Sequence, residues 1–212
     1  MKDAMAGTEI EYWDTCVFLA LLKNEMHRPG EAQYVSDQAR KFDIGSLSIV
    51  TSTLTVTEIL ESKMTDIQIA RLKEIFGKSN FQFIDANFRV CELASEIRNY
   101  YAEHNVSVLG AKKLQVTTPD AIQVASAIAA QRLAKQPIKL LTFDSDNKPA
   151  RGHMAMESLN GLVANKYRLE IGRPTLKNQQ ATLILPQDTD TPNLLDSSPP
   201  PNAKGGGLGD RA

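Results

Sequence analysis

The sequence contains few cysteines, no long apolar run and no excess of charge of either sign. Its 212 residues include two cysteines, Cys16 and Cys91, too few for the disulfide framework that stabilises small secreted domains. No stretch approaches the roughly 18 consecutive apolar residues of a membrane-spanning helix. The 24 basic residues nearly cancel the 25 acidic ones, which excludes the whole-chain basic excess that drives non-specific binding to nucleic acid.

These absences predict a soluble, cytoplasmic protein. Residues 1–11 contain no apolar run of signal-peptide length. Cys16 and Cys91 lie inside apolar periodic stretches, and we expect both to be buried free thiols in a reducing compartment. An apolar content of 42% over this length is enough for one well-filled core. Any contact with nucleic acid therefore has to come from a local patch of charge.

Apolar segments of strand type and helix type alternate along the chain. Residues 10–13 form a short apolar element that stops at Asp14 and runs into an apolar helix candidate. Residues 47–52 are rich in β-formers and lead into a helix near Thr55. A third strand candidate at 81–85 is followed by apolar residues at helical spacing over 88–101. The order is therefore β, α, β, α.

The second half continues the alternation. Thr118, Pro119 and Asp120 stand in the order of cap, first-turn proline and early carboxylate, which predicts a helix from Pro119 to Ala134. Residues 138–143 are a continuous apolar strand of the buried, parallel type, and 167–171 are a last strand. We therefore predict an α/β fold, a three-layer α/β/α domain over 1–172 with a mostly parallel central sheet.

The composition changes beyond Pro174. Residues 187–212 are rich in proline, serine and glycine. Such a segment buries too little apolar surface to offset the entropy lost on ordering. We expect a flexible C-terminal tail there, joined to the domain by an extension at 173–186, and we expect it to be dispensable for activity.

Four acidic residues fall at the junctions of these elements, and each has an ordinary structural explanation. Asp14 is placed as a helix N-cap, and Thr55 with Glu58 fits a capping box. Asp120 in a first helical turn complements the helix dipole, and Asp144 breaks a strand. For each acid considered alone, the structural explanation is favoured over a functional one.

Taken together, the four acids indicate a metal site. In a parallel sheet the carboxyl ends of the strands share one edge, where ligands bind, so we expect Asp14, Glu58, Asp120 and Asp144 to converge there. Four carboxylates in one crevice repel one another unless a cation is present. Oxygen ligands suit Mg²⁺ or Mn²⁺. Zinc is disfavoured, because no histidine or cysteine clusters with the acids in the sequence.

The segments around these acids resemble those of the PIN-domain nucleases, in particular the VapC-type toxin ribonucleases of toxin–antitoxin pairs. The resemblance extends over residues 10–146. It rests on four segments, which are 12–15 (YWDT), 55–59 (TVTEI), 119–127 (PDAIQVASA) and 141–146 (LTFDSD). None of the four is specific alone, and their order and spacing together carry the resemblance.

The resemblance implies a metal-dependent endoribonuclease. Asp14, Glu58, Asp120 and Asp144 would hold one or two Mg²⁺ or Mn²⁺ ions that activate water for attack on an RNA phosphodiester. Support for this quartet would come from Thr15, Thr118, Thr142 and Asp146. The resemblance also implies RNA as the substrate and, as possible partners, a cognate antitoxin and a second copy of the chain. The lack of a long apolar run predicts no association with a membrane.

The sequence departs from the small toxins in its length, its extended 105–117 segment, its tail and Asn147, which stands where an aromatic residue often follows the last acid. These departures bear on the biological role more than on the chemistry. Basic residues near the acidic edge are candidates for contacts with RNA phosphates, with solvated surface residues as the alternative. They are Lys112, Lys113, Lys148 and Arg151. No role is predicted for the three histidines, His27, His104 and His153.

Two other functions are compatible with the sequence. A metal-dependent phosphohydrolase of small substrates would share the fold and the carboxylates. It would be expected to have a phosphate-gripping glycine loop, and the sequence before the tail shows none. A catalytically silent PIN-like scaffold or RNA-binding subunit would keep the acids only as caps, and the presence of all four acids argues against it.

Overall fold

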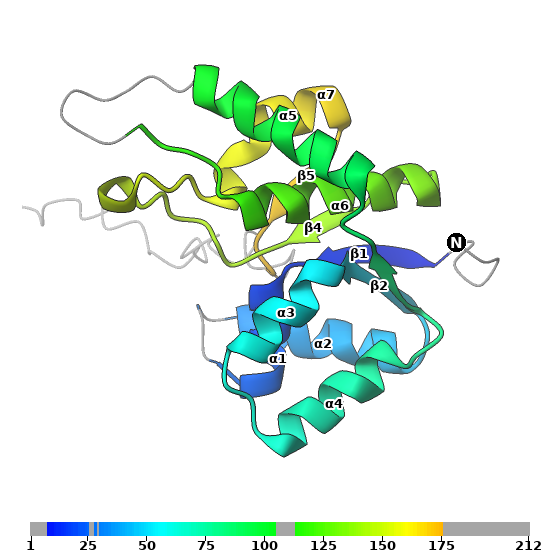
Figure 1. The fold of residues 1–212 in the computed structure, drawn as a ribbon. Helices are drawn as coiled ribbons and strands as arrows, with labels where there is room; N and C mark the ends of the chain where they lie inside the picture. The colour runs from blue at the N-terminus through cyan, green and yellow to red at the C-terminus, as the bar shows by residue number, and fades with distance from the viewer. Residues whose placement is uncertain (1–7, 26–27, 29, 105–112, 176–212) are drawn as a thin grey trace, which may run out of the picture. The chain divides into compact units, whose positions relative to one another are not determined.

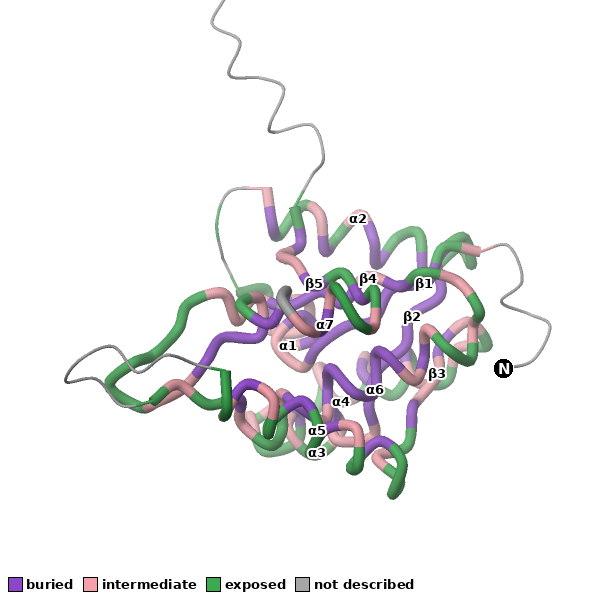
Figure 2. Tube along the Cα trace, turned by 90° about the horizontal axis from the view of Figure 1, so that it is seen from above, coloured by how far each residue is buried: buried purple, intermediate pink, exposed green. Residues whose placement is uncertain are grey.

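A sheet of five parallel strands forms the centre of the computed structural model (Figure 1). The strands lie in the order β3-β2-β1-β4-β5, and every neighbouring pair is parallel. They are β1 (Glu9–Trp13), β2 (Leu47–Ser52), β3 (Phe81–Ile84), β4 (Lys139–Leu141) and β5 (Glu170–Gly172). All six residues of β2 are buried, as expected of a strand covered on both faces (Figure 2). The predicted parallel sheet is confirmed.

The structure describes residues 8–25, 28, 30–104 and 113–175. These residues all belong to one unit that spans Met1–Leu176. The predicted tail at 187–212, most of the predicted extension at 173–186 and Lys112 lie outside the described residues. Within the described part, no helix is both long enough and apolar enough to cross a membrane.

Helices cover both faces of the sheet (Figure 1). One face carries α1 (Thr15–Lys23), α2 (Glu31–Asp43), α3 (Thr53–Glu61) and α4 (Asp66–Phe76). The other face carries α5 (Phe88–His104), α6 (Thr118–Ala134) and α7 (Asn160–Tyr167). The predicted three-layer α/β/α architecture is confirmed for this unit.

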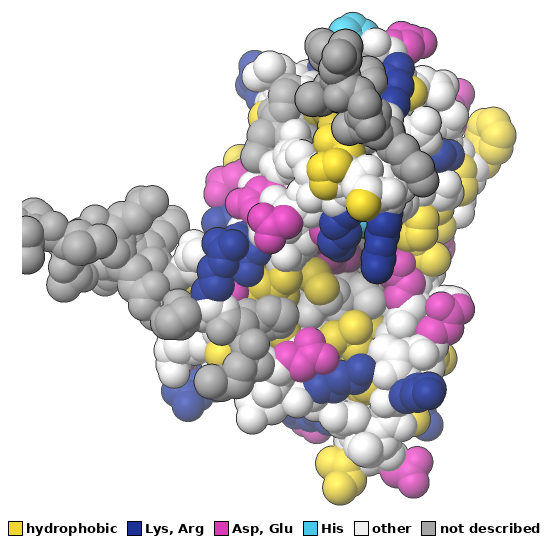
Figure 3. Space-filling view, turned by 90° about the vertical axis from the view of Figure 1, so that its left-hand side faces the viewer, with side chains coloured by type: hydrophobic (Ala, Val, Ile, Leu, Met, Phe, Trp, Pro, Cys, Tyr) yellow, Lys and Arg dark blue, Asp and Glu magenta, His cyan; other side chains and the backbone are white. Residues whose placement is uncertain are grey.

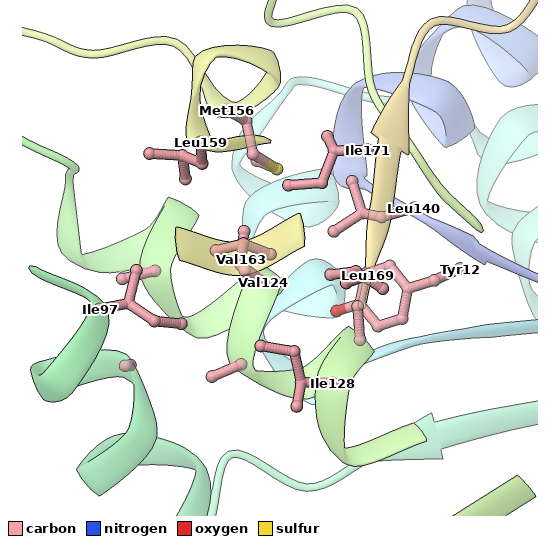
Figure 4. Packing of buried hydrophobic residues seen from close by; sticks show 14 of the residues in the cluster. Tyr12, Ile97, Val124, Ile128, Leu140, Met156, Leu159, Val163, Leu169 and Ile171 are labelled. Carbon is pink, nitrogen blue, oxygen red and sulfur yellow. The ribbon is translucent and has the colours of Figure 1, made fainter. Parts of the chain in front are cut away.

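Neighbouring strand residues point into two separate hydrophobic clusters, one on each face of the sheet. On β1, Tyr12 joins the cluster beneath α5, α6 and α7, where it lies with Ile128 and Leu140 (Figure 4). The next residue, Trp13, joins the cluster beneath α1 to α4, with its ring centroid 5.4 Å from that of Phe18. Both β1 residues are fully buried. Burial of a large apolar side chain contributes roughly 1.5–3 kcal/mol, so Trp13 is a core residue, as its place in a strand predicts.

Three helices of the structure are not predicted from the sequence pattern. Helix α2 follows Gly30, which offers no side-chain cap. Helix α4 has a capping box between Thr65 and Gln68, a signal that the sequence does contain. Helix α7 occupies 160–167, so the strand predicted at 167–171 is wrong at its start, and β5 begins at Glu170.

Two helix starts also differ from the prediction. Ser52 caps α3, and the helix begins at Thr53. The predicted capping box of Thr55 and Glu58 is therefore wrong, and Glu58 lies in the second turn of α3 instead of at its start. Thr117 caps α6 in place of Thr118, because its hydroxyl accepts a hydrogen bond from the backbone N–H of Asp120 at 3.3 Å.

Both cysteines are free thiols, but the prediction that both are buried is wrong. Cys91 is exposed, because α5 buries Val90, Ala94 and Ile97 on one side and Cys91 faces away from that side. Cys16 is half-buried. It lies beside the acidic residues of the candidate site.

A buried ion pair ties the end of the sheet to the first helical layer. Arg173 directly follows β5, and its guanidinium contacts both carboxylate oxygens of Glu31 at the start of α2, with Nη2 donating to Oε2 at 3.0 Å. The same guanidinium donates to the carbonyl of Phe143 at 3.3 Å and to the hydroxyl of Ser145. Burial opposes ionisation of Glu31, but hydrogen bonds from Arg173 and Arg28 outweigh it and lower its pKa. Arg173 thus holds the segment on either side of Asp144.

Replacing Arg173 with methionine is expected to lower the free energy of unfolding by about 3 kcal/mol, since it leaves the Glu31 carboxylate buried without its partner. The Glu31 side chain is only 3% exposed. Urea unfolding measures the change. The matched control is Arg40→Met, which removes an exposed pair with Asp37 and is expected to leave the midpoint unchanged. Equal midpoints for the two variants would contradict the assigned role of Arg173.

Candidate functional site

The strand order creates a crevice at the carboxyl ends of β1 and β4. From β1 the chain passes to β2 and β3 on one side, and it later returns to β4 and β5 on the other side. Ligands bind at such a switch point in open parallel sheets. Asp14 directly follows β1, Asp144 lies three residues beyond β4, and α3, which carries Glu58, begins directly after β2. Three of the four acids predicted from the sequence therefore lie at one edge of the sheet.

Asp14 is the most enclosed of the four acids. It caps α1 by accepting from the backbone N–H of Thr15 at 2.7 Å, as the structural reading of the sequence predicts. Its second carboxylate oxygen accepts from the thiol of Cys16 at 3.0 Å and from the hydroxyl of Thr142 at 2.9 Å. Burial raises the pKa of Asp14 to about 6, hydrogen bonds from Cys16, Thr142 and Thr15 oppose the rise, and the charge of Asp120 adds to it.

Thr142 links the two strand-end acids. Its side chain is fully buried, and its hydroxyl donates to Asp14 while accepting from the backbone N–H of Asp144 at 3.0 Å. The backbone N–H of Asp14 in turn donates to the carbonyl of Leu141 at 3.1 Å. The residues that follow β1 and β4 are therefore held in a definite register to each other.

Glu58 is held by a network centred on Gln123 of α6. The Nε2 atom of Gln123 lies 3.0 Å from Glu58 Oε2 and 3.0 Å from Thr55 Oγ1, and the Thr15 hydroxyl also donates to Glu58. The Oε1 atom of Gln123 accepts from the hydroxyl of Tyr12 at 2.6 Å. Gln123 lies one helical turn after Asp120, on the same side of α6. No role was predicted for it, although a fully buried glutamine needs a network of this kind.

Asp120, Asp144 and His153 form one compact cluster. Each of the three side chains offers one ligand atom, and these atoms all lie within 4.8 Å of one another. The Nε2 atom of His153 is 3.1 Å from Asp120 Oδ2 and 3.4 Å from Asp144 Oδ2. The sequence-based statement that no histidine clusters with the acids is therefore wrong, because His153 comes from a loop nine residues beyond Asp144. Among the described residues, Asp14 and Glu58 do not join this cluster.

Burial and the neighbouring carboxylate both act on Asp120. Burial raises the pKa of Asp120, and the charge of Asp144 adds to the rise, while the hydroxyl of Thr117 and the proximity of His153 oppose it. Ligands in adjacent positions around a divalent cation, at about 2.1 Å from it, are about 3 Å apart. The two separations that involve His153 Nε2, 3.1 Å to Asp120 and 3.4 Å to Asp144, are near this value. Two carboxylates and an imidazole in this arrangement fit a divalent cation.

Of the four residues predicted to support the site, two contact the acids and two do not. Thr15 and Thr142 contact Glu58 and Asp14, as described above. Thr118 and Asp146 are exposed. Neither makes a contact with the four acids that we can identify among the described residues.

The basic candidates also differ among themselves. The Nζ atom of Lys148 is 3.4 Å from Asp144 Oδ1. Arg151 lies in a short helix, η2 (Pro149–Arg151), and both it and Lys113 are exposed. Lys and Arg side chains are intermixed with Asp and Glu on the face drawn in Figure 3. Lys148 is thus the candidate that directly adjoins the acidic cluster.

No family model and no curated protein matches the chain. Several solved structures are similar to it, among them the following two. The crystal structure of VapBC2 from Rickettsia felis bound to a promoter DNA fragment is 12% identical, covers 77% of this chain and 98% of its own, and has a TM-score of 0.46. A toxin–antitoxin complex from Klebsiella pneumoniae is 16% identical, covers 69% of this chain and 97% of its own, and has a TM-score of 0.40.

Proposed function

We propose that this protein is a metal-dependent endoribonuclease whose centre is built on Asp120 and Asp144. The observation that supports the proposal is the convergence of these two carboxylates, from α6 and from the segment after β4, at the carboxyl edge of a parallel sheet. Carboxylates this close favour a bound cation, because each raises the cost of ionising the other. A divalent cation there would supply positive charge to the oxygens of a phosphodiester and would acidify a water molecule.

In this proposal each residue of the site has a separate role. Asp120 and Asp144 hold the cation, Mg²⁺ or Mn²⁺. Asp14 acts through Thr142, which positions the backbone of Asp144. Glu58, held by Gln123, offers a further carboxylate on the same edge. Lys148 neutralises part of the charge of Asp144 and stands where a phosphate would approach.

The substrate class follows from the motifs and not from the cluster alone. RNA is the substrate implied by the PIN-like segments around the acids, and a cognate antitoxin and a homodimer are the partners that the same resemblance implies. The cluster by itself also serves a phosphohydrolase of small substrates. A test of function therefore has to include both kinds of substrate.

Incubation of the full chain with a mixed RNA pool and Mn²⁺ is expected to yield shorter fragments with 5′-phosphate ends. A chelator is expected to abolish cleavage, and added Mn²⁺ in excess of the chelator is expected to restore it. Hydrolysis of a small phosphate ester such as p-nitrophenyl phosphate, measured in parallel, is expected to be undetectable. Ester hydrolysis without RNA cleavage would favour the small-substrate enzyme, and no activity on either substrate would favour a silent scaffold.

A further inference from the structure

We propose that His153 is a metal ligand of this centre, and that its nitrogen gives the centre a preference for Mn²⁺ or a similar first-row transition ion over Mg²⁺. The inference rests on the proposed function, since it deepens the identity of the cation that Asp120 and Asp144 would hold. It adds a nitrogen donor to a centre for which the sequence predicts only oxygen donors.

The placement of the imidazole is the first observation. Its Nε2 atom is buried and lies 3.1 Å from Asp120 Oδ2 and 3.4 Å from Asp144 Oδ2. These are separations expected of adjacent ligands around one ion, about 3 Å. A cation bound to both carboxylates would therefore lie within reach of the imidazole without rearrangement of the backbone.

The second observation is that Nε2 makes no hydrogen bond of acceptable geometry with any described residue. A buried polar atom without a partner is costly unless something else satisfies it. The nearby carboxylate oxygens are close, but they are not aligned with the ring nitrogen as hydrogen-bond acceptors. A cation shared with the two carboxylates would satisfy the lone pair of a neutral imidazole.

The backbone of His153 is held to both acid-bearing segments. On one side, the N–H of Lys148 donates to the carbonyl of His153 at 2.9 Å, four residues after Asp144. On the other side, the N–H of Met154 donates to the carbonyl of Gln115 at 3.0 Å, just before α6 and Asp120. The position of the imidazole relative to the two carboxylates is thus set by main-chain hydrogen bonds.

The side chains of Asn147 and Asp144 also hold the loop that carries His153, through hydrogen bonds to its backbone. The side-chain oxygen of Asn147 accepts from the backbone N–H of Ala155 at 2.7 Å. The Oδ2 atom of Asp144 accepts from the backbone N–H of Met156 at 3.0 Å. Asn147 is a residue at which the sequence departs from the toxins that it resembles, and its place in the structure is to fold the His153 loop back onto the acids.

Donor chemistry decides the preferred ion. Mg²⁺ favours oxygen ligands and retains water in preference to nitrogen. Imidazole binds first-row transition ions more readily, and affinities for a given nitrogen site rise from Mn²⁺ to Cu²⁺ and fall again at Zn²⁺, which still binds more tightly than Mn²⁺. One nitrogen among two carboxylates therefore favours Mn²⁺ over Mg²⁺ and removes the original reason for disfavouring zinc.

The rival interpretation is that a protonated His153 serves as an internal counter-ion for the two carboxylates. The two interpretations predict opposite effects of removing the imidazole. If His153 is a ligand, its removal weakens the binding of Mn²⁺. If it is a positively charged counter-ion, its removal leaves the two carboxylates freer to bind Mn²⁺, and the binding becomes stronger. Measurement of binding therefore separates them without reference to catalysis.

Mn²⁺ binding to the full chain is measured by titration calorimetry, with Mg²⁺ in parallel, for the wild type, His153→Gln and His104→Gln. His104 is an exposed histidine on α5 that stacks on Tyr100, and its replacement is the matched control. The expected result is a loss of Mn²⁺ affinity of at least about tenfold in His153→Gln only. The affinity for Mg²⁺ is expected to change by less than about threefold in all variants, since Mg²⁺ depends little on nitrogen.

A spectroscopic arm requires no variant. Pulsed electron paramagnetic resonance of Mn²⁺ bound to the wild type, with ¹⁴N-histidine and then ¹⁵N-histidine, is expected to show coupling to one directly bound nitrogen. Absence of nitrogen coupling, absence of Mn²⁺ binding, or unchanged or tighter Mn²⁺ binding in His153→Gln would overturn the inference. Nitrogen-coupled Mn²⁺ without RNA cleavage would support the ligand and refute the ribonuclease. RNA cleavage without nitrogen coupling would support the ribonuclease and refute His153 as a ligand.

Discussion

Replacing Asp144 with asparagine is expected to reduce metal-dependent RNA cleavage by about 10²–10³-fold while the protein remains folded. Asparagine keeps an oxygen that can accept from the N–H of Met156, so the loop keeps its hydrogen bond. It removes the negative charge that a cation requires, and it also relieves repulsion with Asp120. The loss corresponds to about 3–4 kcal/mol of the activation barrier. Initial rates of cleavage of a labelled RNA at saturating Mn²⁺ measure it.

Asp85→Asn is the matched control for this experiment. Asp85 also directly follows a strand, β3, but it is exposed and does not belong to the cluster of Asp120, Asp144 and His153. Its replacement is expected to leave the cleavage rate within about twofold of the wild type. Full activity of Asp144→Asn, or an equal loss in both variants, would show that the cluster is not the catalytic centre.

Replacing Gln123 with leucine is expected to lower the free energy of unfolding by about 4 kcal/mol. Leucine has a similar volume, so the main cost is polar. It leaves the buried hydroxyl of Tyr12 without its acceptor and the hydroxyl of Thr55 without the amide, and each orphaned group costs about 1–3 kcal/mol. Denaturant unfolding monitored by the fluorescence of the single tryptophan, Trp13, which is fully buried, measures the change.

Gln33→Leu gives the same substitution at an exposed site. Gln33 lies on α2, where its amide bonds only to Asp37 among the contacts identified for it, one turn along the helix. Its replacement is expected to change stability by less than about 0.5 kcal/mol. If Gln123→Leu were as stable as Gln33→Leu, the polar network beneath Glu58 would be dispensable for folding. Its use as a support for the site would then have no basis.

The sequence carried the information for the sheet, because the signals for its strands are local. Apolar or β-rich runs at β1, β2 and β3, each followed by a helical pattern, and the continuous apolar run at β4 predict parallel strands covered on both faces. The same local logic placed Asp14 and Asp144 just beyond strands, and a parallel sheet brings all its carboxyl ends to one edge. The helix over 119–134 was also predicted nearly to the residue, since its cap, proline and early acid are consecutive in the chain.

Tertiary structure alone decided which groups meet at that edge. The four acids do not all join one ligand cluster, because Asp14 is occupied as a cap and by Cys16 and Thr142. Glu58 lies in the second turn of its helix, bound to Gln123. The contacts of Asp14 with Thr142 and of Glu58 with Gln123 join residues far apart in the sequence, which are brought together by strand order and by the packing of α6 on the sheet.

His153 is the clearest example of a site residue that the sequence does not predict. It has no periodic neighbours and no motif, and in the sequence it is one of three scattered histidines. It reaches Asp120 because two main-chain hydrogen-bonded bridges, to Gln115 and to Lys148, fold its loop between the acid-bearing segments. Hydrogen bonds between backbone groups are independent of side-chain identity, so the pairing that places this imidazole leaves no mark in the sequence and exists only once the chain is folded.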